Sequence, residues 1–214
     1  MFIINPYVFA AGSTDILVVL LGHRDTTGGA ATWPAGWTAF GAAIVNNTNI
    51  VGECRWKEDG GESSITITLA NTSVLTYGVY RIRNHTGNPD GTGVSGGAST
   101  TTPDPPNHNP GVTRNFWVAA TSWQADSPVG SLAYPTNYSD NRQTTGTANQ
   151  TAIGMASRVT SATSENPGTF TIDTSRRSVS WTLGFPGAST VVNSKTTGNN
   201  TTNTSHSITI PAAV

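Results

Sequence analysis

Residues 178–185 read Ser178-Val179-Ser180-Trp181-Thr182-Leu183-Gly184-Phe185, with an apolar side chain at every second position. The same alternation appears in Ile65-Thr66-Ile67-Thr68-Leu69 and, on a shorter scale, in Phe170 and Ile172. Successive side chains of a strand point to opposite faces of the sheet, so this pattern predicts short strands with one face in water. We expect four residues of the quoted stretch to be buried (Val179, Trp181, Leu183 and Phe185) and three to point outward (Ser178, Ser180 and Thr182).

Strand-like runs recur along the whole chain, and no strong helical stripe accompanies them. They include residues 15–21, 42–45, 49–57, 64–70, 74–83, 114–123 and 151–160, with turn signals between them. One all-β domain can reach about 200–250 residues, so a chain of 214 residues predicts a single all-β sandwich of jelly-roll type. We expect residues 1–190 to form this domain and residues 191–214 to be an Asn/Thr-rich linker followed by a terminal strand.

The charge balance argues against two classes of partner. Lys and Arg number 11 and Asp and Glu number 12, which leaves a net charge of -1. This balance provides no electrostatic reason to bind nucleic acid or an anionic membrane. The longest apolar run, Ile16–Leu21, is far too short to span a bilayer. We therefore expect no nucleic-acid partner and no membrane insertion.

Cys54 is the only cysteine, so no disulfide forms within the chain. Its place in the strand-like run 50–56 favours a small core-facing thiol over a reactive one. The lack of disulfides fits folding in a cytoplasm. Residues 1–10 lack the basic start and long apolar core of a signal peptide.

Several short motifs match catalytic signatures without the context that the chemistry requires. Gly93-Val94-Ser95-Gly96-Gly97 fits the nucleophile pattern G-x-S-x-G, but it lies in a Gly/Ser/Thr loop with no helix after the serine. His23-Arg24-Asp25 resembles part of a kinase catalytic loop but lacks its partner motifs. Glu58, Asp59 and Glu62 share one Gly-rich turn, whereas glycosidase carboxylates face each other across a cleft. We expect no catalytic residues and no cofactor.

Residues 84–113 form the longest irregular stretch, and its prolines cannot join a sheet interior. A loop of this length is usually functional, disordered or held by a partner. His85, Asp90, Asp104 and His108 lie here and could supply metal ligands, but they have no ligand-like spacing. The favoured interpretation is solvated loop residues, and no metal site is predicted.

The six tryptophans offer the strongest candidates for ligand contact. Trp33, Trp37, Trp117 and Trp123 could form a sugar-stacking platform. Trp117 and Trp123 fall on one face of their strand. Packing in the core is the competing interpretation for most of the six.

A series of structural motifs resembles a module common in tailed-phage and prophage structural proteins. The apolar run from Asp15 to Asp25 leads into the turn Trp33-Pro34-Ala35-Gly36-Trp37-Thr38. The strands with Arg55-Trp56-Lys57 and Val79-Tyr80-Arg81 follow, and residues 165–170 continue the series. The resemblance covers roughly residues 12–190. It implies a β-sandwich or jelly roll on a virion surface, in a tail fibre, a tail tip or a capsid decoration.

The end of the chain departs from that module. A strand of the type Ser-x-x-Ile-Thr-Ile-Pro-Ala usually precedes the apolar strand, but here it appears as Ser205 to Ala213, and Phe2 to Ala10 stands in its place. Either the chain is cut at the start of a second module, or the terminal strand serves another subunit.

The terminal strand itself carries one face made of His206, Ile208 and Ile210. The stretch 193–205 before it has no apolar residue and predicts a linker. An unpaired strand invites pairing with a sheet edge. We expect residues 206–211 to be an assembly strand that pairs with an edge in another copy rather than in its own chain.

Three functions follow from these patterns. The favoured one is a non-enzymatic structural protein of a tailed-phage virion. It would be made in the host cytoplasm, exposed on the tail or capsid, and would assemble with copies of itself or with other virion proteins. The alternative is a carbohydrate-binding adhesion module of a phage fibre that binds a host surface glycan. A hydrolase on the same scaffold would need two carboxylates that face each other in a groove.

Overall fold

The computed structural model describes residues 15–24, 27, 29–47, 50–61, 63–125, 129–144, 151–188 and 190–210, and of residues 190–204 only the backbone. These residues form thirteen strands. The all-β class predicted from the sequence is confirmed. Within the described ranges there is no helix long and apolar enough to cross a membrane.

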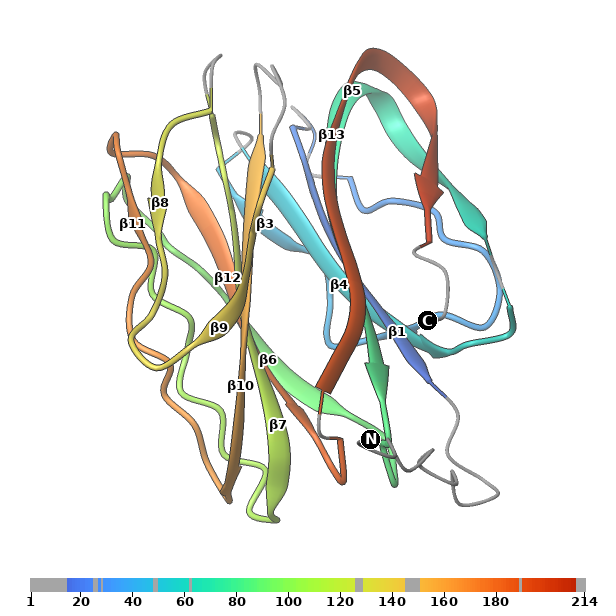
Figure 1. Cartoon of the computed structure of the whole chain (residues 1–214). Coiled ribbons are helices and arrows are strands. Elements are labelled where there is room, and N and C mark those ends of the chain that lie inside the picture. Colours follow the sequence, from blue (N-terminus) through green and yellow to red (C-terminus); the bar gives the residue numbers. More distant parts are fainter. Residues whose placement is uncertain are drawn as a thin grey trace, which may run out of the picture.

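Eleven strands form two antiparallel sheets that pack face to face (Figure 1). Sheet A has the order β13-β5-β1-β4-β2, and β3 also pairs with β4. Its strands are β1 Ile16–His23, β2 Thr38–Ala39, β3 Ile44–Asn46, β4 Ile50–Glu58, β5 Ser64–Arg83 and β13 Thr190–Thr209. Sheet B has the order β6-β12-β7-β10-β9. Its strands are β6 Asp90–Ser95, β7 Arg114–Trp123, β9 Ser139–Gln143, β10 Ala152–Ala162 and β12 Ser178–Phe185.

The main core lies between the two sheets. Alternate residues of β1 (Ile16, Val18 and Leu20) face alternate residues of β12 in this core. The four apolar residues expected to be buried in β12 are all buried here: Val179, Trp181, Leu183 and Phe185. Cys54 is buried in the same core, as predicted.

The outer face of sheet A is covered by a ribbon made from its edge strand β13 and the adjacent strand β5. β5 and β13 pair from Arg83↔Thr190 to Ser64↔Thr209, and the two strands bend together so that their far ends return over the sheet (Figure 1). Ile65 and Ile67 of the returning end pack with Leu17 and Val19 of β1 in a second core. The sheet therefore has a dry face on both sides.

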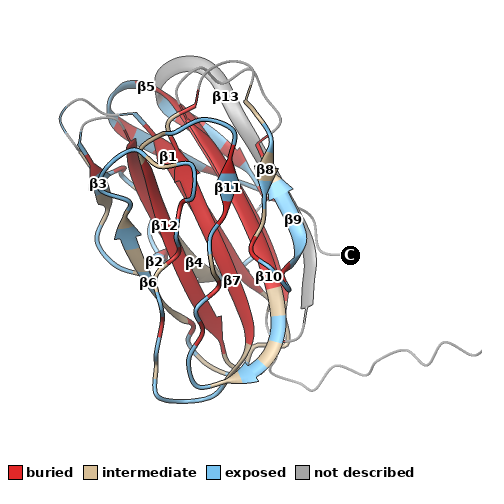
Figure 2. Ribbon diagram, turned by 90° about the vertical axis from the view of Figure 1, so that its left-hand side faces the viewer, coloured by how far each residue is buried: buried red, intermediate tan, exposed pale blue. Residues whose placement is uncertain are grey.

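The outer face of sheet B is covered as well, which corrects one expectation. Ser178, Ser180 and Thr182 do point away from the main core, but they are buried rather than in water. The loop between β6 and β7 lies over them, and Thr182 Oγ1 donates to the carbonyl of Pro106 (2.6 Å). The small sheet of β8 (Leu132–Ala133) and β11 (Thr171–Ile172) extends this cover (Figure 2).

The predicted linker and assembly strand also differ from the expectation. Residues 193–205 belong to the continuous strand β13. The terminal strand does pair with a sheet edge, but it does so within its own chain, with Ile208 opposite Ile65 and His206 opposite Ile67. His206, Ile208 and Ile210 are buried by this pairing. Within the single chain, β5 carries the alternation that matches this strand, whereas pairing with another copy stays a prediction. Phe2 to Ala10 and Pro211 lie outside the described residues.

Candidate functional site at the β2–β6 edge

The two sides of the sandwich differ. On the β9–β13 side the Tyr80 hydroxyl donates to the carbonyl of Asp140 across the sheets (2.7 Å). On the opposite side, where β2 and β6 end their sheets, Asn46 Nδ2 donates to the carbonyl of Ser178 (2.9 Å) near one end. Further along this edge the surface is hollowed.

Two adjoining recesses of about 460 and 280 Å³ lie along β2, and both are lined by Thr38 and Trp56. We treat them as one groove, the edge groove. Its lining comes from three segments of the chain: residues 36 and 38–40, residues 56–60, and residues 88–91. The edge groove is therefore shared between sheet A and the start of β6.

The floor of the edge groove is aromatic. Trp56 lies directly opposite Thr38 in the β2–β4 pairing. Trp56 and Phe40 are partly buried and pack against the main core. The Phe40 ring meets the Phe185 ring edge to face, with centroids 6.2 Å apart. Both floor rings are thus held by the core while part of each remains accessible.

The rim of the edge groove is polar, and its charges largely cancel. Asp59 is paired with Arg81, and Asp90 is paired with Arg114. The remaining charged lining residues are Lys57 and Glu58, which have opposite signs. The edge groove consequently has little net charge.

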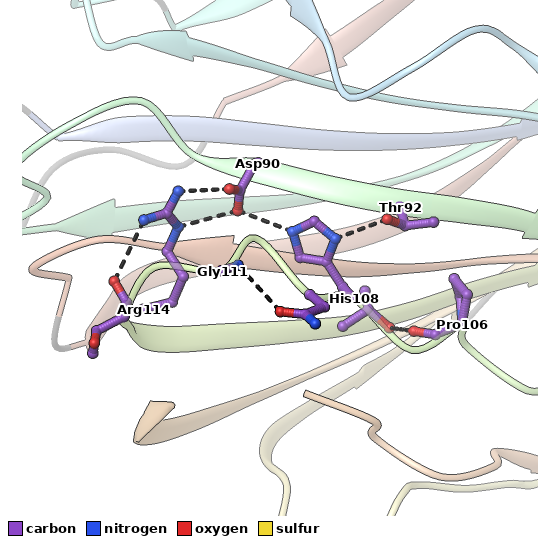
Figure 3. Close-up of polar contacts among 9 residues, drawn as sticks. Asp90, Thr92, Pro106, His108, Gly111 and Arg114 are labelled. Atoms are coloured by element: carbon purple, nitrogen blue, oxygen red, sulfur yellow. Dashed lines mark hydrogen bonds and ion pairs between the residues drawn. The ribbon is translucent and has the colours of Figure 1, made fainter. Parts of the chain in front are cut away.

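A network around Asp90 fixes one wall of the edge groove (Figure 3). Arg114 at the start of β7 donates from Nη2 to Asp90 Oδ2 (2.5 Å) and from Nε to Oδ1 (3.1 Å). His108 Nε2 lies 3.0 Å from the same Oδ1. The Asp90 carboxylate therefore ties together the edge strand β6, the strand β7 and the loop between them.

His108 joins this network to the rest of the loop. Its Nδ1 lies 2.7 Å from Thr92 Oγ1, and its backbone makes two hydrogen bonds of 2.9 Å with that of Glu165. The ring meets Trp117 edge to face at a centroid distance of 6.2 Å. With the Thr182 contact to Pro106, these bonds hold the long stretch between β6 and β7 against sheet B.

Two opposing causes act on the Asp90 pKa. Partial burial raises the pKa. The hydrogen bonds and charges of Arg114 and His108 lower the pKa by more than burial raises it, so the net shift is downward. The carboxylate is thus stabilised in its charged form. A carboxylate, an imidazole and a hydroxyl in series also occur in nucleophilic catalysis. Here the Arg114 guanidinium already matches the Asp90 charge, so the geometry fits a structural clamp best.

The structure unites only part of the grouping considered for a metal. Asp90 and His108 come together, and Arg114 rather than His85 or Asp104 completes their network. Across the described ranges no cluster of three or more His, Cys, Asp or Glu side chains could hold a metal ion.

The four tryptophans do not lie together on one exposed surface. Trp117 and Trp123 are buried beneath the cover of sheet B, which corrects that expectation. Trp33 and Trp37 pack against each other on the opposite side, over sheet A, with ring centroids 5.6 Å apart. The four rings therefore lie on the outer sides of two different sheets.

The sequence interpretation missed the edge groove. Trp56 is one of the six candidate tryptophans but not one of the four in the predicted platform, although the run Arg55-Trp56-Lys57 places its ring between charged residues near the end of a strand. Glu58 and Asp59, assigned only to a turn, line the groove. Ser95 ends β6, and its Oγ accepts from the Gly97 N–H (3.3 Å) in a local turn.

No protein-family model matches the sequence, and no curated protein and no solved structure is similar to it. These comparisons assign no family. The function of the chain is therefore inferred from its own fold, from the edge groove and from the structural motifs of its sequence.

Proposed function

We propose that this protein is a non-enzymatic structural protein of a tailed-phage virion, exposed on the tail or capsid and assembled with copies of itself or with neighbouring virion proteins. The observation that carries the proposal is the position of the motifs that resemble those of tailed-phage structural proteins. Their residues hold neighbouring strands and loops of the sandwich together rather than forming a reaction centre, and we call each such place a joint.

The turn from Trp33 to Trp37 is the clearest of these joints. The Trp33 Nε1–H donates to Glu53 Oε2 (2.9 Å), and the Arg55 guanidinium lies over the Trp33 ring, 5.1 Å from its centroid. The Ala31 N–H also donates to Glu53 (2.5 Å). Glu53 is buried, so its charge is matched by these donors and by Arg55. The motif thus fastens a loop over the outer face of sheet A.

The second joint is an ion-pair network at the other end of β1. Arg81, from the Tyr-Arg strand motif, is buried and pairs with Asp59 and Asp15. Arg83 Nε donates to the same Asp15 (3.2 Å). Such a network fixes the entry of the first apolar strand, as a building block of a rigid assembly requires.

The pairing order supports a jelly-roll type for this sandwich. Early strands pair with late ones in a nested series: β5 with β13, β6 with β12, and β7 with β10. In a chain with this nested order, strands from the first half of the domain pair with strands from the second half. Jelly rolls are common in capsid proteins.

Immunogold electron microscopy tests the proposal directly. Antibodies are raised against the purified chain and applied to particles released from a host that carries the gene. We expect gold on the tail or capsid of intact particles, and no label after the antibodies are preadsorbed with the purified chain. Antigen confined to the soluble lysate, with unlabelled particles, would contradict a virion role.

A further inference from the structure

We propose that the edge groove is a binding site for a neutral saccharide. The inference deepens the proposed function and rests on it in one respect: exposure on a virion would bring the groove to glycans of a host surface. The binding itself is a property of the isolated chain and is measured separately.

The first argument is the aromatic floor. Trp56 and Phe40 are partly accessible in the groove and are fixed by the main core, with Phe40 in edge-to-face contact with Phe185. The axial C–H groups of a pyranose form an apolar face that packs on such a ring. Few side chains then need to be ordered when the ligand binds, which lowers the free-energy cost of association.

The second argument is the set of polar groups beside the rings. Thr38, Glu58 and Asn88 line the edge groove. Within the described part of the chain, no hydrogen bond or ion pair engages the side chains of these three residues. A hydroxyl, a carboxylate and an amide together offer both donors and acceptors. Sugar hydroxyls, which also donate and accept, are the complementary ligand groups.

The third argument is charge. Asp59 and Asp90 are matched by Arg81 and Arg114, and Lys57 stands beside Glu58. A site for a polyanion, such as a nucleic acid or a phosphorylated polysaccharide, would present an excess of cations. The groove has no such excess, so its charge fits a neutral saccharide better than an anionic one.

The fourth argument is that both walls are already fixed. The Phe40 N–H donates to the Cys54 carbonyl (3.0 Å), and the Asp59 N–H donates to the Asp15 carbonyl (2.8 Å). On the opposite wall, the clamp of Asp90, Arg114 and His108 holds the start of β6. A preformed groove of this kind does not require loop ordering before it can bind.

The test begins with the full chain on an array of neutral and anionic oligosaccharides. The neutral glycan with the highest signal is then titrated by isothermal calorimetry. We expect Thr38→Ala/Asn88→Ala to weaken this binding by at least about tenfold, because two hydrogen bonds are lost. Trp56→Leu, which keeps apolar packing but removes the ring, should abolish it.

The control is Thr66→Ala/Asn107→Ala, which removes a hydroxyl and an amide from exposed positions outside the groove. It should bind as the original chain does. If Trp56→Leu fails to fold by circular dichroism, the Thr38 and Asn88 variant carries the test, since both residues are exposed.

Three results would overturn the proposal. These are no neutral glycan bound on the array, equal binding by the groove variant and the control, or a preference for anionic glycans. None of them affects the immunogold result. A labelled particle without saccharide binding would refute this inference alone, and saccharide binding without labelled particles would refute only the virion role.

Discussion

Trp181 fits between the sheets because neighbouring strands carry glycines opposite it. A β-carbon at Gly52 of β4 would collide with the Trp181 ring and with Val179, and one at Gly93 of β6 would collide with the ring and with Ile44. The largest side chain of β12 is thus accommodated by two positions without side chains. The packing depends on matched sizes on facing strands rather than on hydrophobicity alone.

Removing this side chain should leave a cavity that the rigid sheets cannot fill. Trp181 is 2% exposed, so we expect Trp181→Ala to lower the free energy of unfolding by about 3–5 kcal/mol. Chemical denaturation followed by far-ultraviolet circular dichroism measures the change. Val159→Ala, at a position 64% exposed, is the matched control and should change little. An unchanged midpoint for Trp181→Ala would show that the register of β12 is wrong.

The complementary change adds volume where none is available. We expect Gly52→Ala to cost about 1–3 kcal/mol, because the new methyl group meets Trp181 and Val179. The double variant Gly52→Ala/Trp181→Leu should be more stable than the sum of its single changes predicts, since the smaller side chain relieves the collision. Strict additivity in denaturation midpoints would refute direct contact between the two positions.

The reactivity of Cys54 provides a chemical test of burial in the same core. Burial raises the pKa of its thiol well above the usual range, so the thiol stays protonated and unreactive at neutral pH. We expect a thiol reagent such as dithionitrobenzoate to label the chain only after denaturation. Rapid stoichiometric labelling of the folded chain at pH 8 would contradict the placement of Cys54.

At the scale of elements, β6 is a strand that local sequence patterns do not predict. Its residues Asp90 to Ser95 lie inside a stretch predicted to be irregular, because Gly91 and Gly93 have low strand propensity. A β-carbon at Gly91 would meet Leu183 and Phe40, so the strand needs glycine to approach β12 and the residue that follows β2. The requirement comes from residues that are distant in the sequence, and no local pattern reveals it.

The clamp on β6 should make stability depend on pH in one direction. The folded-state pKa of Asp90 is lowered, so its contribution is fully present above the unfolded value of about 3.9 and is lost as the pH falls through the folded value. We expect Asp90→Asn to cost about 1–2 kcal/mol at neutral pH. The difference from the original chain should hold to about pH 5 and shrink below about pH 4 in urea titrations. A difference that grows on acidification would contradict this assignment.

The β5–β13 ribbon is the opposite case: local patterns predict both strand-like segments, but they do not predict that these segments pair with each other. The alternation of Ile65, Ile67 and Leu69 and the terminal face of Ile208 and Ile210 were both recognised as strand-like. Their pairing was not, because a polar stretch of Asn and Thr between 193 and 205 has the composition of a linker. This stretch is ordered as a strand because its backbone pairs with β5, although its side-chain composition does not predict a strand.

At the scale of the whole molecule, removing one end of the ribbon measures separately how the terminal strand affects stability and how it affects assembly. Removing residues 205–214 should uncover the second core around Leu17 and Ile67, because Ile208 and Ile210 no longer cover it. We expect a lower denaturation midpoint and binding of a hydrophobic dye, with no loss of oligomeric mass in light scattering, since the strand pairs within its own chain. A truncated chain that keeps its stability but loses mass would restore the idea of an exchanged strand.

The pairing of β5 with β13 also bears on how the protein is synthesised. Arg83 leaves the ribosome 107 residues before its partner Thr190, and Ile65 leaves it 143 residues before its partner Ile208. At about 5–20 residues per second, β5 waits roughly 5–30 s with one edge unpaired. Its alternating isoleucines are a surface for aggregation during that time. Codon usage or a chaperone acting between residues 84 and 190 would then control the yield of folded protein more strongly than the final stability does.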